Sequence, residues 1–181
     1  LKSGYFSDRQ RPLAVSGPDG RGDFPGLERW LDALVGPGGA YAYLSGYRDG
    51  TDGLVLLEPV TASHQVGAAT EILRNDRLTV TALGVPHGIV PSVAYRIEAG
   101  GKVLVFGSDQ NGSDEQFAVF ARNADLLIAH LAVPESASCH TACAWRPAGT
   151  RRVVDDALVG RWGRAGRGPS ALPRSGFCRA R

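Results

Sequence analysis

The sequence has 181 residues, of which 43% are hydrophobic, 8% aromatic and 21% charged. This is the composition of one soluble globular domain. No stretch reaches the roughly 18 to 20 apolar residues that a membrane-spanning helix needs, and the first residues, Leu1 to Tyr5, lack the layout of a signal peptide. We therefore expect a cytoplasmic protein with no membrane association. Because the sequence contains no Met, we also expect it to begin inside a longer protein or after processing.

The net charge of +2 is the sum of two unlike parts. Residues 1–135 carry 11 basic and 16 acidic side chains, whereas residues 136–181 carry 9 Arg and only two Asp. The second part is rich in Arg, Ala and Gly and low in complexity. It is interpreted either as a disordered basic arm that attracts nucleic acid, or as a GC-rich gene read out of frame. We predict one domain over residues 1–135 and a separate tail over residues 136–181.

Short strands alternate with loops and helices in the first part of the chain. An amphipathic helix is predicted from an N-cap at Asp23 to Gly36, because apolar residues recur at spacings of three and four. Its core-facing stripe consists of Phe24, Leu27, Trp30, Leu31, Leu34 and Val35. The neighbouring elements expected by composition are a strand at 11–16, a turn at 17–20, a loop at 36–53, a strand at 54–60 and an ambiguous stretch at 61–76.

Residues 78–133 give a clearer pattern. Strands are predicted at 78–83, 92–97 and 102–107, the last two joined as a hairpin in which Ile97 pairs with Lys102. A helix follows at 114–123, opened by a capping box with Ser113 as N-cap. Residues 125–133 are almost continuously apolar, as in a central strand covered on both faces. The order of strand, helix and strand predicts a parallel crossover.

This topology brings together polar residues that are distant in sequence. The hairpin places His87 and Asp109, which are 22 positions apart, at the same end of the sheet, with a backbone offset of at most about 10 Å. The parallel crossover places His130 near the same edge. Three potential metal ligands are therefore expected at one rim.

The same region resembles a known family. Its segments P-H-G-I-V-P-S-V-A-Y-R-I, K-V-L-V-F-G-S-D and A-D-L-L-I-A-H-L-A-V-P-E are similar, in this order, to the second half of metallo-β-lactamase-fold hydrolases, particularly the ribonuclease Z-like branch. Upstream, S-G-Y-F-S-D-R and R-P-L-A-V-S-G-P-D-G resemble the segment that follows the family's His-x-His-x-Asp-His motif. The resemblance covers residues 1–135 and implies an α/β fold, a partial metallo-β-lactamase αββα sandwich with mixed sheets flanked by helices.

The resemblance also implies site residues. His87 would be a metal ligand, and Asp109 would be the catalytic carboxylate that bridges two metal ions, with zinc expected and Mn or Fe as alternatives. Gly17 and Pro18 would border the active-site cleft. His130 lies one place away from the family's usual His-Glu, so it is given no ligand role and at most a supporting role beside the ligands.

Two further positions depart from tRNA-processing members of the family. Ala94 and Ser108 stand where those members show Gly-Tyr and Gly-Asp-Thr, which favours a general metallo-hydrolase over a tRNA 3′-processing nuclease. The resemblance implies a small-molecule or RNA substrate and a homodimer when the protein is intact.

The chemistry of this family explains the residue types. Two zinc ions about 3.5–4 Å apart lower the pKa of a bound water toward 7 and hold both oxygens of an ester during displacement. We therefore expect a hydrolase of phosphodiesters or related esters. The sequence contains no His-x-His, so we expect that motif before Leu1 and an incomplete, inactive site in this chain. The family's last histidine is also missing, and the tail stands in its place, which favours a truncated or out-of-frame C-terminus.

Simpler interpretations stay open for each residue. His87 fits a solvated turn, Asp109 a turn or cap, His130 a core position, and Gly17 with Pro18 an ordinary turn. A different function is open as well, a non-catalytic nucleic-acid-binding protein that uses the arginine-rich tail.

Overall fold

The computed structural model describes residues 11–51, 54–110, 114–130, 148–150 and 153–155 of the chain. The chain divides into two units, Leu1–Ala62 and Ser63–Arg181, called unit 1 and unit 2. Each contains its own sheet and its own hydrophobic core. The expected domain boundary at residue 135 lies outside the described residues.

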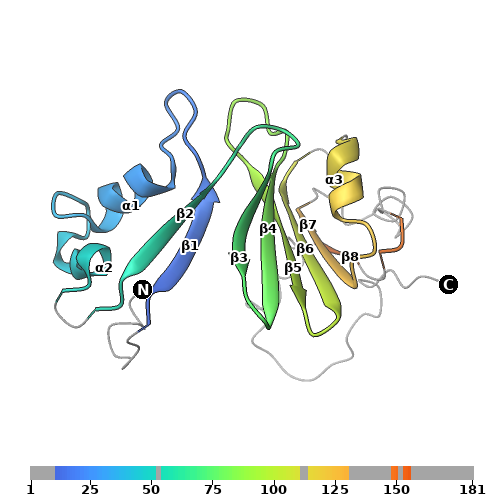
Figure 1. The fold of residues 1–181 in the computed structure, drawn as a ribbon. Helices are drawn as coiled ribbons and strands as arrows, with labels where there is room; N and C mark the ends of the chain where they lie inside the picture. Colours follow the sequence, from blue (N-terminus) through green and yellow to red (C-terminus); the bar gives the residue numbers. More distant parts are fainter. Residues whose placement is uncertain (1–10, 52–53, 111–113, 131–147, 151–152, 156–181) are drawn as a thin grey trace, which may run out of the picture. The chain divides into compact units, whose positions relative to one another are not determined.

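Unit 1 is built on a two-stranded parallel sheet (Figure 1). Strand β1 (Leu13–Pro18) pairs with β2 (Leu57–Ala62), in the register Leu13 to Leu57. The chain between them forms α1 (Leu27–Val35), the 3-10 helix η2 (Ala42–Leu44) and α2 (Gly46–Asp49). The core residues are Leu27, Leu31, Val35, Leu44, Tyr47, Leu54, Val55 and Leu57.

Two expectations for α1 are wrong. The helix begins at Leu27 with Gly26 as its N-cap, so Asp23 does not cap it. Trp30 is not a core residue, because its side chain is 49% exposed. The buried residues Leu27, Leu31 and Val35 recur every four positions, and Trp30 lies about 100° around the helix from Leu31. The buried stripe is therefore narrower than the sequence pattern indicates.

Other boundaries in unit 1 also differ from expectation. Gly17 and Pro18 are the last residues of β1, and the turn follows later, where Arg21 and Phe24 exchange two backbone hydrogen bonds of 3.0 Å. The stretch expected as a loop at 36–53 contains η2 and α2. These helices are too short to show a helical repeat in the sequence, although they bury Leu44 and Tyr47.

Unit 2 is a mixed sheet of six strands in sequential order, β3 to β8 (Figure 1). The first four strands are antiparallel, and β7 and β8 then run parallel to β6. The strand bounds are Ala69–Arg74, Leu78–Gly84, Val93–Ala99, Lys102–Asp109, Leu126–His130 and Val153–Asp155. The predicted strands at 78–83, 92–97 and 102–107 and the parallel crossover are thus confirmed; of the strand predicted at 125–133, residues 131–133 lie outside the described ranges.

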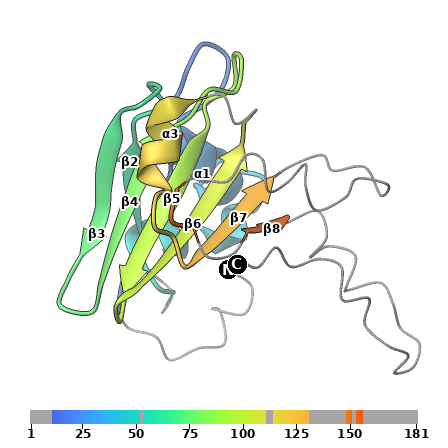
Figure 2. The same ribbon diagram turned by 90° about the vertical axis from the view of Figure 1, so that its right-hand side faces the viewer.

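Helix α3 (Glu115–Phe120) makes the crossover and covers one face of this sheet (Figure 2). Its N-cap is Asp114, whose side chain accepts a hydrogen bond of 3.0 Å from the backbone N–H of Gln116; the N-cap expected at Ser113 lies outside the described residues. Phe117 is fully buried, and burial of such a side chain contributes about 1.5–3 kcal/mol. The core residues of unit 2 are Leu83, Val85, Ala94, Val105, Phe117, Ala121, Ala124, Leu127 and Ala129.

The hairpin between β5 and β6 has a different register from the expected one. Ala99, not Ile97, pairs with Lys102. Only Gly100 and Gly101 form the turn, with φ of 55° and 70°. Two consecutive positive φ angles define a type I′ turn, whose twist matches that of the flanking strands. The expected four-residue loop therefore shortens to two residues, and the pairing shifts.

Six described residues come from the predicted tail. β8 (Val153–Asp155) pairs in parallel with β7, in the register Leu127 to Val153. Thr150 is fully buried and donates a hydrogen bond of 3.3 Å to the carbonyl of Ala121, and the carbonyl of Ala148 accepts one of 3.0 Å from Asn123. The other residues of 136–181 lie outside the described part, and their origin stays a prediction.

The expected class, α/β with mixed sheets flanked by helices, is confirmed by these two units. Within the described ranges, no helix has the length and apolar character required to cross a membrane.

Candidate metal centre

His87 lies in the loop that connects β4 to β5. The loop is closed at its base by a hydrogen bond of 3.0 Å from the N–H of Val85 to the carbonyl of Ser92. It is tightened at its tip by a second bond of 3.1 Å from Val90 to the carbonyl of His87. Gly88 follows with φ of 60°, a conformation that suits glycine because it has no Cβ. The His87 side chain is held at the rim of the sheet and is 35% exposed.

Asp109 is the last residue of β6. The pairing of β6 with β7 is irregular between Phe106 and Asp109, and Ser108 has a left-handed backbone with φ of 57°. Such an irregularity changes the direction in which the following side chain projects. The Asp109 carboxylate is 57% exposed.

The structure brings these two side chains into contact. The distance from His87 Nε2 to Asp109 Oδ2 is 3.2 Å, although the residues are 22 positions apart in the sequence. With both ring nitrogens protonated, the two side chains form an ion pair. An imidazole nitrogen from the β4–β5 loop and a carboxylate oxygen from the end of β6 therefore lie side by side.

His130 is close to this pair in the backbone but belongs to no metal-ligand cluster among the described residues. Its Cα is the partner of Asp109 across the parallel strands β6 and β7. The part of the chain that the structure describes contains no group of three or more His, Cys, Asp or Glu side chains able to hold one metal ion. The interpretation of His130 as a core residue is wrong, because its side chain is exposed at the strand end.

Gly17 and Pro18 belong to unit 1, whereas His87 and Asp109 belong to unit 2. Their expected place beside an active-site cleft stays a prediction.

Two buried polar residues beside Asp109 were not identified from the sequence. Ser92 is 7% exposed, and its hydroxyl lies 3.0 Å from Ser108 Oγ and 3.3 Å from the carbonyl oxygen of Asp109. Gln110 is 8% exposed and donates from Nε2 to the carbonyl of Gly107 at 2.8 Å. Its Oε1 has no hydrogen-bond partner among the described residues. The correct hairpin register would have indicated Ser92, because continuing it from Ala99 and Lys102 places residue 92 opposite residue 109.

The donor atoms of His87 and Asp109 fit a divalent cation. Zinc binds imidazole nitrogen and carboxylate oxygen, and manganese and iron accept the same ligands. Both side chains are partly exposed, so a cation from solvent can reach them. A catalytic zinc site has three protein ligands, and this pair supplies two.

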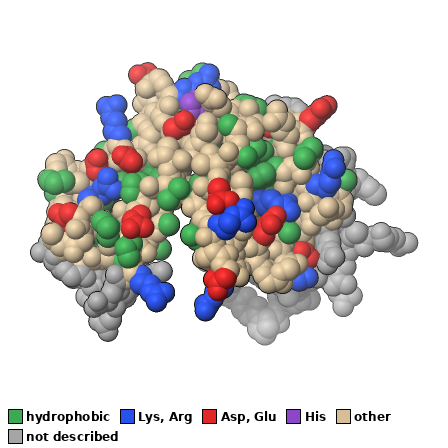
Figure 3. All heavy atoms as spheres, in the orientation of Figure 1, with side chains coloured by type: hydrophobic (Ala, Val, Ile, Leu, Met, Phe, Trp, Pro, Cys, Tyr) green, Lys and Arg blue, Asp and Glu red, His purple; other side chains and the backbone are tan. Residues whose placement is uncertain are grey.

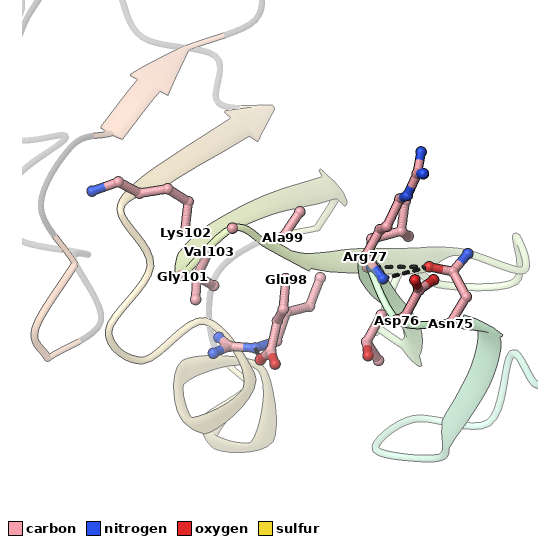
Figure 4. Close-up of a pocket in the computed structure, with 12 residues that line it drawn as sticks. Asn75, Asp76, Arg77, Glu98, Ala99, Gly101, Lys102 and Val103 are labelled. Carbon is pink, nitrogen blue, oxygen red and sulfur yellow. Dashed lines mark hydrogen bonds and ion pairs between the residues drawn. The ribbon is translucent and has the colours of Figure 1, made fainter.

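A hollow at the opposite end of β5 and β6 is separate from this pair (Figure 4). It lies between the β3–β4 and β5–β6 turns, and its lining includes Asp76, Arg77, Glu98 and Lys102. Asn75 Oδ1 organises the first turn by accepting hydrogen bonds from the N–H groups of Arg77 and Leu78, at 2.9 and 3.0 Å. The hollow contains no histidine or cysteine.

Basic and acidic side chains are intermingled on the face of the described residues seen in Figure 3. Ion pairs among the described residues include Arg74 with Glu71 at 2.7 Å and Arg96 with Glu98 at 2.6 Å. All nine arginines of the predicted nucleic-acid-binding tail lie outside the described residues, so that function stays an untested alternative.

Comparisons with known proteins identify structural similarity only. No protein-family model matches the chain, and no curated protein matches it. The metallo-β-lactamase fold protein YhfI from Bacillus subtilis is 21% identical, with a TM-score of 0.41 over 72% of this chain and 42% of that chain. The Zn(2+)-bound PqqB from Methylobacterium extorquens is 18% identical, with a TM-score of 0.39 over 65% of this chain and 33% of that chain. The chain thus spans less than half the length of either protein.

Proposed function

We propose that this chain contributes His87 and Asp109 to the metal centre of a metal-dependent hydrolase. The observation that carries the proposal is the 3.2 Å contact between His87 Nε2 and Asp109 Oδ2. The β4–β5 loop and the end of β6, each fixed by hydrogen bonds, present a nitrogen and an oxygen ligand at one edge of a sheet. The order of motifs around these residues, which resembles the metallo-β-lactamase-fold hydrolases, favours a metal site over an isolated surface ion pair.

The two residues have separate roles in this proposal. His87 binds a cation through Nε2 in its neutral form, and Asp109 binds through its carboxylate. When bound, the cation supplies a water of lowered pKa for attack on an ester. A carboxylate is suited to a position between two cations because its two oxygens can bind different ions.

The finer features of the proposal follow from the sequence resemblance. They are a pair of zinc ions bridged by Asp109, a phosphodiester or related ester substrate of small-molecule or RNA type, a ribonuclease Z-like relationship, and a homodimer. The cytoplasmic location is proposed from the composition and not from the resemblance. Because the pair supplies fewer ligands than a catalytic zinc site uses, the proposal requires further ligands from outside the described residues. The resemblance assigns these to a His-x-His-x-Asp-His segment upstream of Leu1.

The first experiment measures weak metal binding directly. Zn²⁺ is titrated into the 181-residue chain, and amide chemical shifts are followed by NMR. We expect saturable shifts around His87 and Asp109, and their loss in His87→Ala and in Asp109→Asn. His64→Ala is the matched control, because His64 is a half-buried histidine of the same unit without a proposed ligand role. Equal titrations of all four proteins, or the absence of saturable shifts in the unmodified chain, would contradict the proposal.

The second experiment tests the reaction. Hydrolysis of bis-p-nitrophenyl phosphate is expected to be near background for residues 1–181 with Zn²⁺. It should appear when the chain is extended upstream by a His-x-His-x-Asp-His segment, and His87→Ala should abolish it. Hydrolysis by the unextended chain that depends on His87 would overturn the expected incompleteness of the site.

A further inference from the structure

We propose that Ser92 is a positioning residue that joins the loop carrying His87 to the end of β6 carrying Asp109 and thereby sets the separation of the two side chains. The inference rests on the proposed function only in that His87 and Asp109 are taken to bind a metal ion. Three contacts of Ser92 carry it, one through its backbone and two through its hydroxyl.

The backbone contact fixes the His87 loop. The carbonyl of Ser92 accepts the N–H of Val85 at 3.0 Å, so the chain leaves β4 and returns to β5 at a single point. Val85 is 2% exposed and belongs to the core of unit 2. The base of the loop is therefore anchored in the core, and His87 lies two residues beyond that anchor.

The side chain of Ser92 fixes the end of β6 that carries Asp109. Its hydroxyl donates to the carbonyl oxygen of Asp109 at 3.3 Å. Because a serine hydroxyl has one proton, the 3.0 Å contact with Ser108 Oγ is then a bond in which Ser108 donates to Ser92. The result is a chain of hydrogen bonds from Ser108 through Ser92 to the backbone of Asp109.

The hydrogen bonds from Ser108 through Ser92 to Asp109 lie where they can hold the backbone in place. Ser92 is 7% exposed, so water competes poorly for its hydroxyl, and loss of this hydroxyl removes the donor to the Asp109 carbonyl and the acceptor of the Ser108 hydroxyl. Ser108 has φ of 57°, a conformation that a residue with a Cβ adopts only when its surroundings enforce it. The bond from Ser108 to Ser92 is one such constraint, and it acts on the residue immediately before Asp109.

The test compares Ser92→Ala with Thr150→Ala in the 181-residue chain. Both changes remove one buried hydroxyl of unit 2, but Thr150 bonds to Ala121 at the C-terminal end of α3. For Ser92→Ala we expect faster amide hydrogen exchange in residues 85–88 and 108–110. We also expect Zn²⁺ binding weaker by roughly tenfold, the lower end of the loss seen when groups that orient metal ligands are removed. Thr150→Ala should lower the melting temperature while leaving both readouts unchanged.

Two further variants separate loss of the Ser92 hydroxyl from general loss of folding. Ser92→Thr retains the hydroxyl and should restore exchange protection toward that of the unmodified chain. If Ser92→Ala does not fold, Ser108→Gly is the milder change, because glycine accepts the left-handed backbone, and it should increase exchange mainly in residues 108–110.

The exchange measurement needs no metal, so the two proposals fail separately. Unchanged exchange and unchanged Zn²⁺ affinity in Ser92→Ala would overturn the role of Ser92. An unmodified chain that shows no Zn²⁺ binding at His87 and Asp109 would overturn the proposed function. Amide exchange in Ser92→Ala would still decide whether Ser92 holds the His87 loop and the end of β6 together.

Discussion

Ala99 pairs directly with Lys102 across strands β5 and β6, so that the turn between them consists of Gly100 and Gly101 alone. This pairing determines which residues face each other along the whole hairpin. At its far end it places Ser92 beside Asp109, where the serine hydroxyl reaches the aspartate carbonyl. The turn and the candidate metal centre therefore lie at opposite ends of one hairpin, and the same register determines both.

Replacement of Gly100 by alanine should destabilise unit 2 by about 1 kcal/mol, because an L-residue in the left-handed region costs roughly 1–2 kcal/mol. Gly100 has φ of 55°, and a Cβ added there would meet no atom within 4 Å, so the loss would come from the backbone and not from a collision. Gly100→Asn should be tolerated better, because asparagine is common in type I′ turns.

Chemical denaturation measures the free energies of unfolding of Gly100→Ala and Gly100→Asn against that of the unmodified chain. Gly38→Ala is a suitable control, because Gly38 also has open space around it and no left-handed φ. Equal stability of Gly100→Ala and Gly100→Asn would argue against the I′ geometry.

The elements around the candidate site are the ones that the sequence indicates best. The alternation at Leu78 to Leu83 and the apolar run from Asp125 are strong local patterns, and the parallel crossover follows from their order. The approach of His87 to Asp109 is a consequence of that topology and does not depend on the exact register. The contact of Ser92 with Asp109 does depend on it, and an error of two residues in the expected turn hid this contact.

Elements without a local pattern were not predicted. η2 and α2 are too short for a helical repeat, and β8 has only Val153 and Val154 as apolar residues in an Arg-rich context. Their stability comes from tertiary contacts, such as the burial of Tyr47 and the pairing of β8 with β7. Trp30 illustrates the reverse case, since its spacing fits the apolar stripe while its side chain is half exposed.

Asp125 should matter more for stability than its ion-pair partner Lys102. One carboxylate oxygen accepts the backbone N–H of Val103 at 2.9 Å, and the other lies 3.2 Å from Lys102 Nζ. The lysine is 70% exposed, and exposed ion pairs contribute about 0–1 kcal/mol. Asp125→Ala leaves a part-buried N–H without its acceptor, which costs about 1–3 kcal/mol.

We therefore expect Asp125→Ala to lower the free energy of unfolding by at least about 1 kcal/mol and Lys102→Ala by less than about 0.5 kcal/mol. Asp125→Asn keeps an acceptor oxygen and should fall between them. A larger loss for Lys102→Ala than for Asp125→Ala would show that the ion pair dominates.

The Asp49 carboxylate in unit 1 should titrate with a lowered pKa. The Thr51 hydroxyl and backbone N–H both donate to Asp49 Oδ1, at 2.7 and 2.9 Å, and these bonds hold the pKa of Asp49 below its usual value. A lowered carboxyl pKa stabilises the fold above the pKa of the unfolded chain, about 3.9, and this contribution is lost as the pH falls through the folded pKa.

Thr51→Ala removes the hydroxyl, which is the larger cause, and should raise the pKa of Asp49 toward its usual value, as followed by carboxyl ¹³C NMR. An unchanged pKa in Thr51→Ala would show that the hydroxyl does not bind Asp49 in solution.

The segment from Ala148 to Asp155 should be required for the stability of unit 2. Ala148 accepts a hydrogen bond from Asn123, the buried Thr150 donates one to Ala121, and β8 continues the sheet beyond β7. Each net hydrogen bond contributes about 0.5–1.5 kcal/mol, so removal of the segment should cost roughly 2–4 kcal/mol.

A chain that ends at Pro147 should therefore unfold at a lower denaturant concentration than a chain that ends at Asp155, and the latter should match the 181-residue chain. Thr150→Val, which keeps the shape of the side chain but removes its hydroxyl, should account for about 1 kcal/mol of the difference. If the chains ending at 147 and 155 were equally stable, β8 would not belong to the sheet, and the interpretation of residues 136–181 as an unrelated tail would gain support along its whole length.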